Sequence, residues 1–227
     1  MRFFGHARWT KNPKYCTGCF RMLSSNHGGA EVECSLLFAD VRGSTTLAES
    51  MSPREFNRLM GRFLDTATDV LVDHDGIVDK FVGDEIIGLF GAPIQLDDAV
   101  FKAVVCALDM LKSLREFNRT RQAENQPPIL IGIGVNTGKV ITGAIGSTRA
   151  LQYTAIGDAM NIASRLVSLA KPNEIIVSDH TYQRIKDRVE AVPLPPVMVK
   201  GKAEEQKIFR VLGLRGARDW LADPTHS

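Results

Sequence analysis

The sequence predicts an α+β fold of ferredoxin-like (βαββαβ) type, in which helices cover one face of a mainly antiparallel sheet. Segments with strand and helix signals follow the order strand, helix, hairpin, helix, hairpin, which is the order of this fold. One hairpin, at residues 77–93 (IVDKFVGDEIIGLFGAP), has a tight-turn signal at Gly83-Asp84 between two β-rich runs. The helical segments repeat apolar residues at the spacing of one helix face, so each has one side to bury against the sheet.

The first half of the chain supplies the opening strand, helix and hairpin. A strand over residues 32–39 ends at Asp40, and VRGSTTLAES after it predicts a turn and a short helix. The next helix has a well-defined start, because Ser52, Pro53 and Glu55 suit an N-cap, a first-turn proline and a capping-box partner. We expect that helix to end near Asp75-Gly76, directly before the hairpin.

The second half of the chain completes the order and adds a C-terminal extension. A helix from Asp97 to about Arg121 is followed by strands at 129–135 and 140–145, which we expect to form a second hairpin around Asn136-Thr137-Gly138-Lys139. The stretch from Leu151 to Ala155 leads through Gly157-Asp158 into a helix that runs to about Ala170. The remaining expected elements are a strand at 174–177, a short helix at 179–186, a break at Pro193–Pro196 and a closing strand at 207–212.

Composition describes an ordinary globular protein with one main domain. The chain has 227 residues, of which 44% are hydrophobic and 24% charged. Its net charge of +2 comes from scattered basic residues, so the sequence predicts no nucleic-acid partner. It contains no apolar run long enough to span a bilayer, and its N-terminus lacks the apolar middle of a signal peptide. We therefore expect a cytoplasmic protein with no membrane span.

Residues 1–30 are expected to form an N-terminal appendage, and residues 214–227 a tail. The appendage contains Cys16-Thr17-Gly18-Cys19, which is half of a structural zinc site. His27 and Cys34, or the same pair from a second subunit, would complete the four ligands. Two ordinary thiols or a redox pair are the alternatives. Cys34 and Cys106 lie in apolar runs and are expected to be small buried residues.

Two aspartates are placed to meet at one end of the predicted sheet. Asp40 follows the first strand, and Asp84 lies at the tip of the 77–93 hairpin. If these strands are neighbours, the two carboxylates lie close together and suit Mg²⁺, which prefers oxygen ligands. Each aspartate taken singly is better explained by its conformational role in a turn.

Asn161 and Arg165 lie four residues apart on the predicted helix from 158 to 170, so both side chains project from one face. On their own they indicate no more than an exposed polar stripe. Their meaning depends on the other polar residues of the chain.

From about Val32 to Val211 the chain resembles the catalytic domain of the class III adenylate and guanylate cyclases. Four stretches carry the resemblance, in family order and spacing: LLFADVRGSTTLAE, VDKFVGDEIIGLFGAP, LQYTAIGDAMNIASRL and PVMVKGKAEEQKIFRV. The resemblance implies a palm-type cyclase sandwich, with residues 31–213 as the catalytic domain. It also implies a homodimer with two Mg²⁺ or Mn²⁺ ions in each site.

The resemblance assigns a role to each of seven residues. The metal-binding aspartates correspond to Asp40 and Asp84, and the adenine-selecting pair to Lys80 and Thr154, as in the bacterial subclass with threonine at the second position. The ribose-orienting asparagine and the transition-state arginine correspond to the remaining pair, Asn161 and Arg165. A lysine that meets the terminal phosphates corresponds to Lys200, with Lys202 as the near alternative.

These residue types agree with conversion of ATP to 3′,5′-cyclic AMP and pyrophosphate. Adenine offers an acceptor at N1 and a donor at N6, whereas guanine offers the reverse at N1 and O6. Lys80 donates a hydrogen bond and Thr154 can accept one, so ATP is favoured over GTP. Guanylate cyclases of the family carry Glu and Cys at these positions.

Besides a guanylate cyclase, two other functions stay open at this point. Residues 82–86 (VGDEI) resemble the GGDEF turn of diguanylate cyclases, although Val82 replaces the first glycine. The second alternative is a cyclase-like module that binds nucleotide without turning it over. Product analysis after incubation with nucleotide and metal separates these possibilities.

Overall fold

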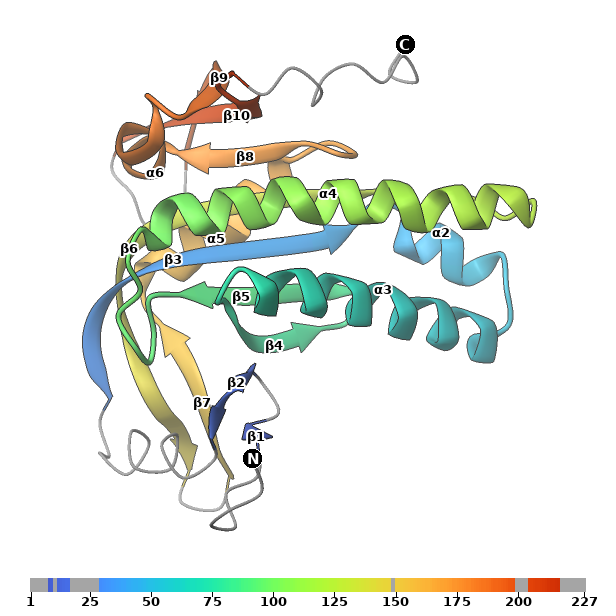
Figure 1. Ribbon diagram of the computed structural model, residues 1–227, viewed down its shortest axis with the longest axis horizontal. Helices are drawn as coiled ribbons and strands as arrows, with labels where there is room; N and C mark the ends of the chain where they lie inside the picture. The colour runs from blue at the N-terminus through green and yellow to red at the C-terminus, as the bar shows by residue number, and fades with distance from the viewer. Residues whose placement is uncertain (1–7, 10–11, 17–28, 148–149, 199–203, 217–227) are drawn as a thin grey trace.

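The computed structural model describes residues 8–9, 12–16, 29–147, 150–198 and 204–216 (Figure 1). The first half of the chain forms β1 (Arg8–Trp9), β2 (Asn12–Cys16), β3 (Ala30–Val41), α2 (Ser44–Glu49), α3 (Pro53–Asp73), β4 (Ile77–Val82), β5 (Glu85–Phe90) and α4 (Ala99–Ala123). The second half forms β6 (Ile131–Ser147), β7 (Ala150–Ile156), α5 (Asp158–Leu169), β8 (Ile175–Ser178), α6 (Asp179–Ile185), β9 (Val189–Val197) and β10 (Gln206–Leu214).

The order β3–α3–β4–β5–α4–β6 confirms the predicted βαββαβ arrangement. The strands of the main sheet lie in the order β4-β5-β3-β6-β8-β10-β9, and β7 pairs with β6 off this path. Every pair is antiparallel except β6 with β8, which is parallel. The elements after β7 form the C-terminal extension and enlarge the sheet on the side away from the β4–β5 hairpin.

Helices pack on both faces of the sheet, so the expectation of a single covered face is wrong. Alternate residues of β3 point to opposite faces, with Leu37 and Ala39 in the core against α3 and α4, and Leu36 and Phe38 in a second core. The second core includes Ala159, Ala163 and Val167 of α5. Small residues at these helix positions let α5 lie close to the sheet, on the side opposite α3 and α4 (Figure 1).

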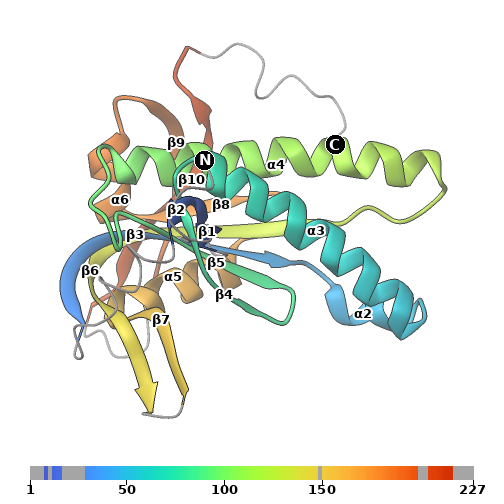
Figure 2. The same cartoon turned by 60° about the horizontal axis from the view of Figure 1, so that its bottom comes forward.

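The predicted hairpin around Asn136–Lys139 is also wrong, because β6 is one strand of 17 residues. Its first part pairs with β3 through Thr142, and its last part pairs with β7. Figure 2 shows the β6–β7 ribbon extending away from the rest of the sheet as an arm. Asn136 is buried in mid-strand, where its side chain donates to the carbonyl of Ala159 at 2.8 Å. It therefore ties α5 to the sheet.

The prolines at 193–196 do not break the chain but lie within β9. Proline has no N–H to donate, so it is tolerated in a strand only where that donor is not needed. β9 meets this condition because, in the part of the chain that the structure describes, it is the last strand of the sheet and pairs only with β10.

Two local signals in the first half are confirmed. Ser52 Oγ accepts from the backbone N–H of Glu55, and the Glu55 carboxylate accepts from the backbone N–H of Ser52 at 2.9 Å, which completes the predicted capping box of α3. Gly83 has a φ of +65°, which allows the tight turn between β4 and β5. No helix among the described residues is long and apolar enough to cross a membrane.

Candidate active site

Asp40 and Asp84 lie at the same end of the sheet. β3 and β5 are antiparallel neighbours with Ala39 opposite Ile86, so Asp40 on β3 lies beside the residues that open β5. Burial raises the pKa of Asp40, the Arg42 guanidinium opposes this, and the negative charge of Asp84 raises the pKa further. The neighbouring strands thus bring the two carboxylates within electrostatic reach, as the sequence predicts.

Arg42 contacts Asp40 and was not predicted as a site residue. Its guanidinium forms an ion pair with the Asp40 carboxylate, and its Nε donates to the Asp40 backbone carbonyl at 3.2 Å. The same side chain also donates to the carbonyl of Ala170 at 3.5 Å. The only sequence signal was its place two residues after Asp40 in the ADVRGST turn.

The carboxylate pair fits a divalent cation by its chemistry. The Oδ2 atom of Asp84 is buried and has no hydrogen-bond partner among the described residues, which leaves an oxygen able to bind a cation. Glu85 lies beside the pair, and its pKa is raised to about 7 by burial and by the charges of Asp40 and Asp84. A cation would relieve this crowding of negative charge.

The protein ligands available for such a cation are few. Among the residues that the structure describes, no group of three or more His, Cys, Asp and Glu side chains is placed to hold a metal. Two carboxylates without a closed protein cage suit Mg²⁺, which keeps several waters and shares its remaining positions with substrate phosphates.

Lys80 on β4 and Thr154 on β7 meet at Asp79, a residue that the sequence analysis did not select. The Thr154 hydroxyl donates to Asp79 Oδ2 at 3.0 Å, and Lys80 Nζ lies 3.4 Å from the same oxygen. Asp79 is 0% exposed, whereas the Lys80 side chain is 33% exposed. The two predicted base-selecting residues are therefore held together within one chain, although β4 and β7 are not paired in the sheet.

Asn161 and Arg165 both lie on α5 and are exposed, as their spacing predicts. In the described chain no hydrogen bond or ion pair joins either side chain to Asp40 or Asp84. The structure thus separates six of the seven predicted residues into a carboxylate pair, the predicted base-selecting pair and a pair on the exposed face of a helix.

The other predicted ligands lie outside the described residues. These are Lys200, its alternative Lys202, Cys19 and His27. Cys16 ends β2, but its side chain is not described either, so zinc binding by the Cys16/Cys19 pair finds no support here.

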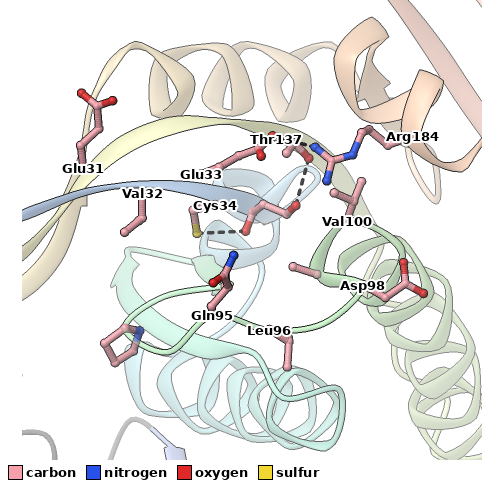
Figure 3. Close-up of a pocket in the computed structure, with 14 residues that line it drawn as sticks. Glu31, Val32, Glu33, Cys34, Gln95, Leu96, Asp98, Val100, Thr137 and Arg184 are labelled. Carbon is pink, nitrogen blue, oxygen red and sulfur yellow. Dashed lines mark hydrogen bonds and ion pairs between the residues drawn. The ribbon is translucent and has the colours of Figure 1, made fainter.

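Two cavities of the described chain lie away from the predicted residues. The larger, about 450 Å³, is lined by the N-terminal half of β3, the 91–100 segment, Thr137 and Arg184 (Figure 3). The second, about 410 Å³, lies between α4, the start of β8 and β10. Neither cavity is lined by any of the six predicted residues that the structure describes.

Comparison with known proteins identifies relatives among nucleotide cyclases. Adenylate cyclase 1 of Rhizobium meliloti is 30% identical over 198 residues, which cover 85% of this chain and 30% of the relative. An adenylate cyclase of Anabaena cylindrica is 32% identical over 187 residues, which cover 78% of this chain and 36% of the relative. The chain thus spans about a third of the length of these curated relatives.

Solved structures of cyclases share the fold. The guanylyl cyclase Cya2 superposes with a TM-score of 0.79 at 32% identity, covering 85% of this chain and 98% of that one. The adenylyl cyclase CyaB from P. aeruginosa superposes with a TM-score of 0.79 at 29% identity, covering 82% and 97%. The family model of the adenylate and guanylate cyclase catalytic domain matches residues 29–213. The chain therefore belongs to the class III family of adenylate and guanylate cyclase catalytic domains.

Proposed function

We propose that this domain is an adenylate cyclase, a phosphorus–oxygen lyase that converts ATP to 3′,5′-cyclic AMP and pyrophosphate. The observation that carries the choice of ATP is the contact of Lys80 and Thr154 with one buried carboxylate. A lysine donor and a hydroxyl acceptor held side by side match N1 and N6 of adenine. In guanine, the N1 donor is mismatched with the lysine, which also donates. The O6 acceptor is mismatched with the hydroxyl only if that hydroxyl is fixed as an acceptor.

The reaction needs positioning and charge stabilisation more than covalent chemistry by the protein. The ribose 3′-oxygen loses its proton and forms a bond to the α-phosphorus, while the bond from that phosphorus to the bridging oxygen breaks and pyrophosphate leaves. Arg165 would present planar N–H donors to the α-phosphoryl oxygens as their charge grows. Asn161 would orient the ribose, and Lys200 would bind the terminal phosphates.

Asp40 and Asp84 are the residues that would hold the divalent cations, Mg²⁺ or Mn²⁺, two in each site. Support comes from their shared position at one end of the sheet and from the buried Oδ2 of Asp84, which no described residue hydrogen-bonds. When bound, such cations supply positive charge to the 3′-oxygen and to the triphosphate. Arg42 must then yield its place on Asp40, or share that carboxylate with the cation.

We further propose that the site forms between two copies of the chain. Exposed apolar side chains surround the base-selecting pair: Phe81 is 48% exposed and Val82 54% exposed beside Lys80, and Ile156 is 47% exposed close to Thr154. Burying such side chains against a second copy is favourable. Asn161 and Arg165 are likewise exposed in the single chain and would face the partner's carboxylates.

Product analysis tests this function directly. Purified domain is incubated with ATP or GTP and with Mg²⁺ or Mn²⁺, and the products are separated by mass spectrometry. We expect cyclic AMP and pyrophosphate from ATP. The variant Asp84→Asn should lose at least 100-fold in turnover, because removing one electrostatic contact to the transition state costs other enzymes about 10²–10³-fold. Asp97→Asn is the matched control, because that aspartate lies in the exposed segment before α4 and should keep full activity.

Other products identify the alternatives. Cyclic GMP from GTP in preference to cyclic AMP would indicate a guanylate cyclase, as in Cya2, and cyclic diguanylate would indicate a diguanylate cyclase. Nucleotide binding without any product would indicate a non-catalytic module. Metal binding has a separate measurement, because Mn²⁺ should raise the melting temperature of the wild type more than that of Asp84→Asn.

A further inference from the structure

Asp79 is a buried carboxylate whose side chain contacts both proposed base-selecting residues. It is 0% exposed, and its Oδ2 atom lies 3.0 Å from the Thr154 hydroxyl and 3.4 Å from Lys80 Nζ. A carboxylate is taken out of water only at a cost, which hydrogen bonds and an opposite charge offset. Its position in the centre of the base-selecting pair therefore calls for a functional explanation.

A β-bulge in β4 explains how the side chains of Asp79 and Lys80, two consecutive residues, come to lie together. Successive residues of a regular strand point to opposite faces of the sheet. The pairing of β4 with β5 shifts between Val78, opposite Gly88, and Lys80, opposite Ile87, so Asp79 is an extra residue. Bulges of this kind re-aim a side chain next to a functional site. Here the bulge is consistent with Asp79 and Lys80 lying together beneath Thr154.

The contact with Asp79 also sets the direction of the Thr154 hydroxyl. A hydroxyl has one proton to donate and lone pairs that accept, so a free threonine can hydrogen-bond either a donor or an acceptor. A carboxylate oxygen has no proton and can only accept, which commits the Thr154 proton to Asp79. The other acceptor within reach, the carbonyl of Ala155, lies farther away at 3.5 Å. The lone pairs of the hydroxyl are left for a ligand that donates.

We propose that Asp79 is a positioning residue that sets base selectivity by holding Thr154 as an acceptor and Lys80 as a donor. This role of Asp79 rests on the proposed function. It supplies what a threonine alone lacks, which is a fixed direction of the hydroxyl proton. An acceptor at this place fits the 6-amino group of adenine and opposes the 6-oxo group of guanine. The selectivity thus belongs to three residues, of which Asp79 itself would touch no substrate.

The variant Asp79→Asn tests this role, because asparagine has nearly the same shape but carries an N–H₂ group that can donate to Thr154. The Thr154 proton is then free to bond the 6-oxo group of guanine. We expect the ratio of kcat/KM for ATP to kcat/KM for GTP to fall by about tenfold or more, which is the effect of about 1.4 kcal/mol and typical of one buried hydrogen bond. The ratio is measured within one preparation, so a smaller folded fraction does not change it.

Two further measurements separate a positioning role from a merely structural one. Purine riboside triphosphate lacks the 6-amino group, so the wild-type preference for ATP over this analogue should shrink in Asp79→Asn. Binding of 3′-deoxy-ATP and 3′-deoxy-GTP, which cannot cyclise, should show the same change in ratio without turnover. Thr137→Val is the matched control: it breaks a buried hydroxyl pair between β6 and β3, strands that carry none of the three residues, so it should lower the melting temperature and leave the ratio unchanged.

The outcomes distinguish this proposal from the proposed function. A wild type that prefers ATP with an unchanged ratio in Asp79→Asn overturns the role of Asp79 and leaves the adenylate cyclase proposal standing. A wild type that prefers GTP overturns both. If the wild type makes no product, the proposed function fails, and the binding ratio of the 3′-deoxy nucleotides still decides the role of Asp79.

Discussion

Cys34 and Cys106 lie in separate cores and are both fully surrounded by protein. Burial raises the pKa of the Cys34 thiol to about 12. The hydrogen bond from this thiol to the carbonyl of Phe90 opposes the rise, and the negative charge of Asp79 adds to it. Burial raises the pKa of Cys106 as well. Because the thiolate is the reactive form, neither side chain should react in the folded protein below pH 9.

Thiol titration checks this expectation in the variant Cys16→Ser/Cys19→Ser, which retains only the two buried cysteines. We expect no reaction with a disulfide reagent at pH 8 in the native state and reaction of two thiols per chain after unfolding in urea. Rapid labelling of a native thiol would contradict the burial of Cys34 or Cys106. The wild type under the same conditions reports the accessibility of the N-terminal pair.

At the scale of single residues, the sequence allowed some functional positions to be predicted but not others. Burial of Cys34 and Cys106 followed from their apolar neighbours and is confirmed. Asp79 could not be found, because a single carboxylate next to a lysine resembles any exposed charged pair. Its burial depends on a bulge and on the return of β7 toward β4, and neither leaves a periodic signal in the sequence.

At the scale of elements, Gly88 marks a place where a strand and a helix are in close contact. A Cβ atom at Gly88 of β5 would overlap Leu71 Cδ1 of α3, and Leu71 is itself 0% exposed. We expect Gly88→Ala to destabilise the domain by about 1–3 kcal/mol, the usual effect of overpacking a core. Thermal or urea unfolding of the purified variant measures this loss.

Gly61 provides the matched control, because it lies in the interior of α3 and a Cβ there meets nothing within 4 Å. Gly61→Ala should stabilise the domain by up to about 1 kcal/mol through helix propensity. Equal effects of the two substitutions would mean that Leu71 moves aside freely. In that case the close packing of α3 on β5 would not limit the residue at position 88.

Element boundaries were predictable where local chemistry decides them and failed where tertiary pairing does. The capping box fixed the start of α3, and the Gly83 turn fixed the β4–β5 hairpin. By contrast, Asn136–Lys139 has the composition of a turn but pairs residue by residue with Glu33–Leu36 of β3. The second covered face of the sheet was not predicted. The apolar stripe of an amphipathic helix indicates that one side of the helix is buried, but it does not indicate which face of the sheet that side covers.

At the scale of the whole molecule, the positions of Lys80 and Asp84 favour a site shared by two chains. The two residues are four apart on one hairpin, yet they are proposed to serve the base and the triphosphate, which lie at opposite ends of ATP. A two-fold dimer resolves this geometry by giving each hairpin a part in both sites. Each site would then take its carboxylates from one chain and its base-selecting pair, Asn161 and Arg165 from the other.

Mixing two inactive variants tests whether each active site is shared by two chains. Asp40→Ala and Arg165→Ala should each be inactive alone, because each damages both sites of its own homodimer. In a mixed dimer both defects fall in one site, so free assortment should restore about a quarter of wild-type activity. Recovery should require time for subunit exchange and should increase with protein concentration. Mixed dimers of confirmed composition that show no activity would place the site within a single chain.

The prolines of β9 also affect how the molecule behaves in a crowded solution. An outer strand with a full set of N–H groups can recruit a strand from another chain, which is the first step toward cross-β aggregates. Pro193, Pro195 and Pro196 remove three of these donors from a strand of nine residues. Strand-by-strand growth is therefore disfavoured at this edge, and replacing the prolines would expose the protein to self-association that has no connection with catalysis.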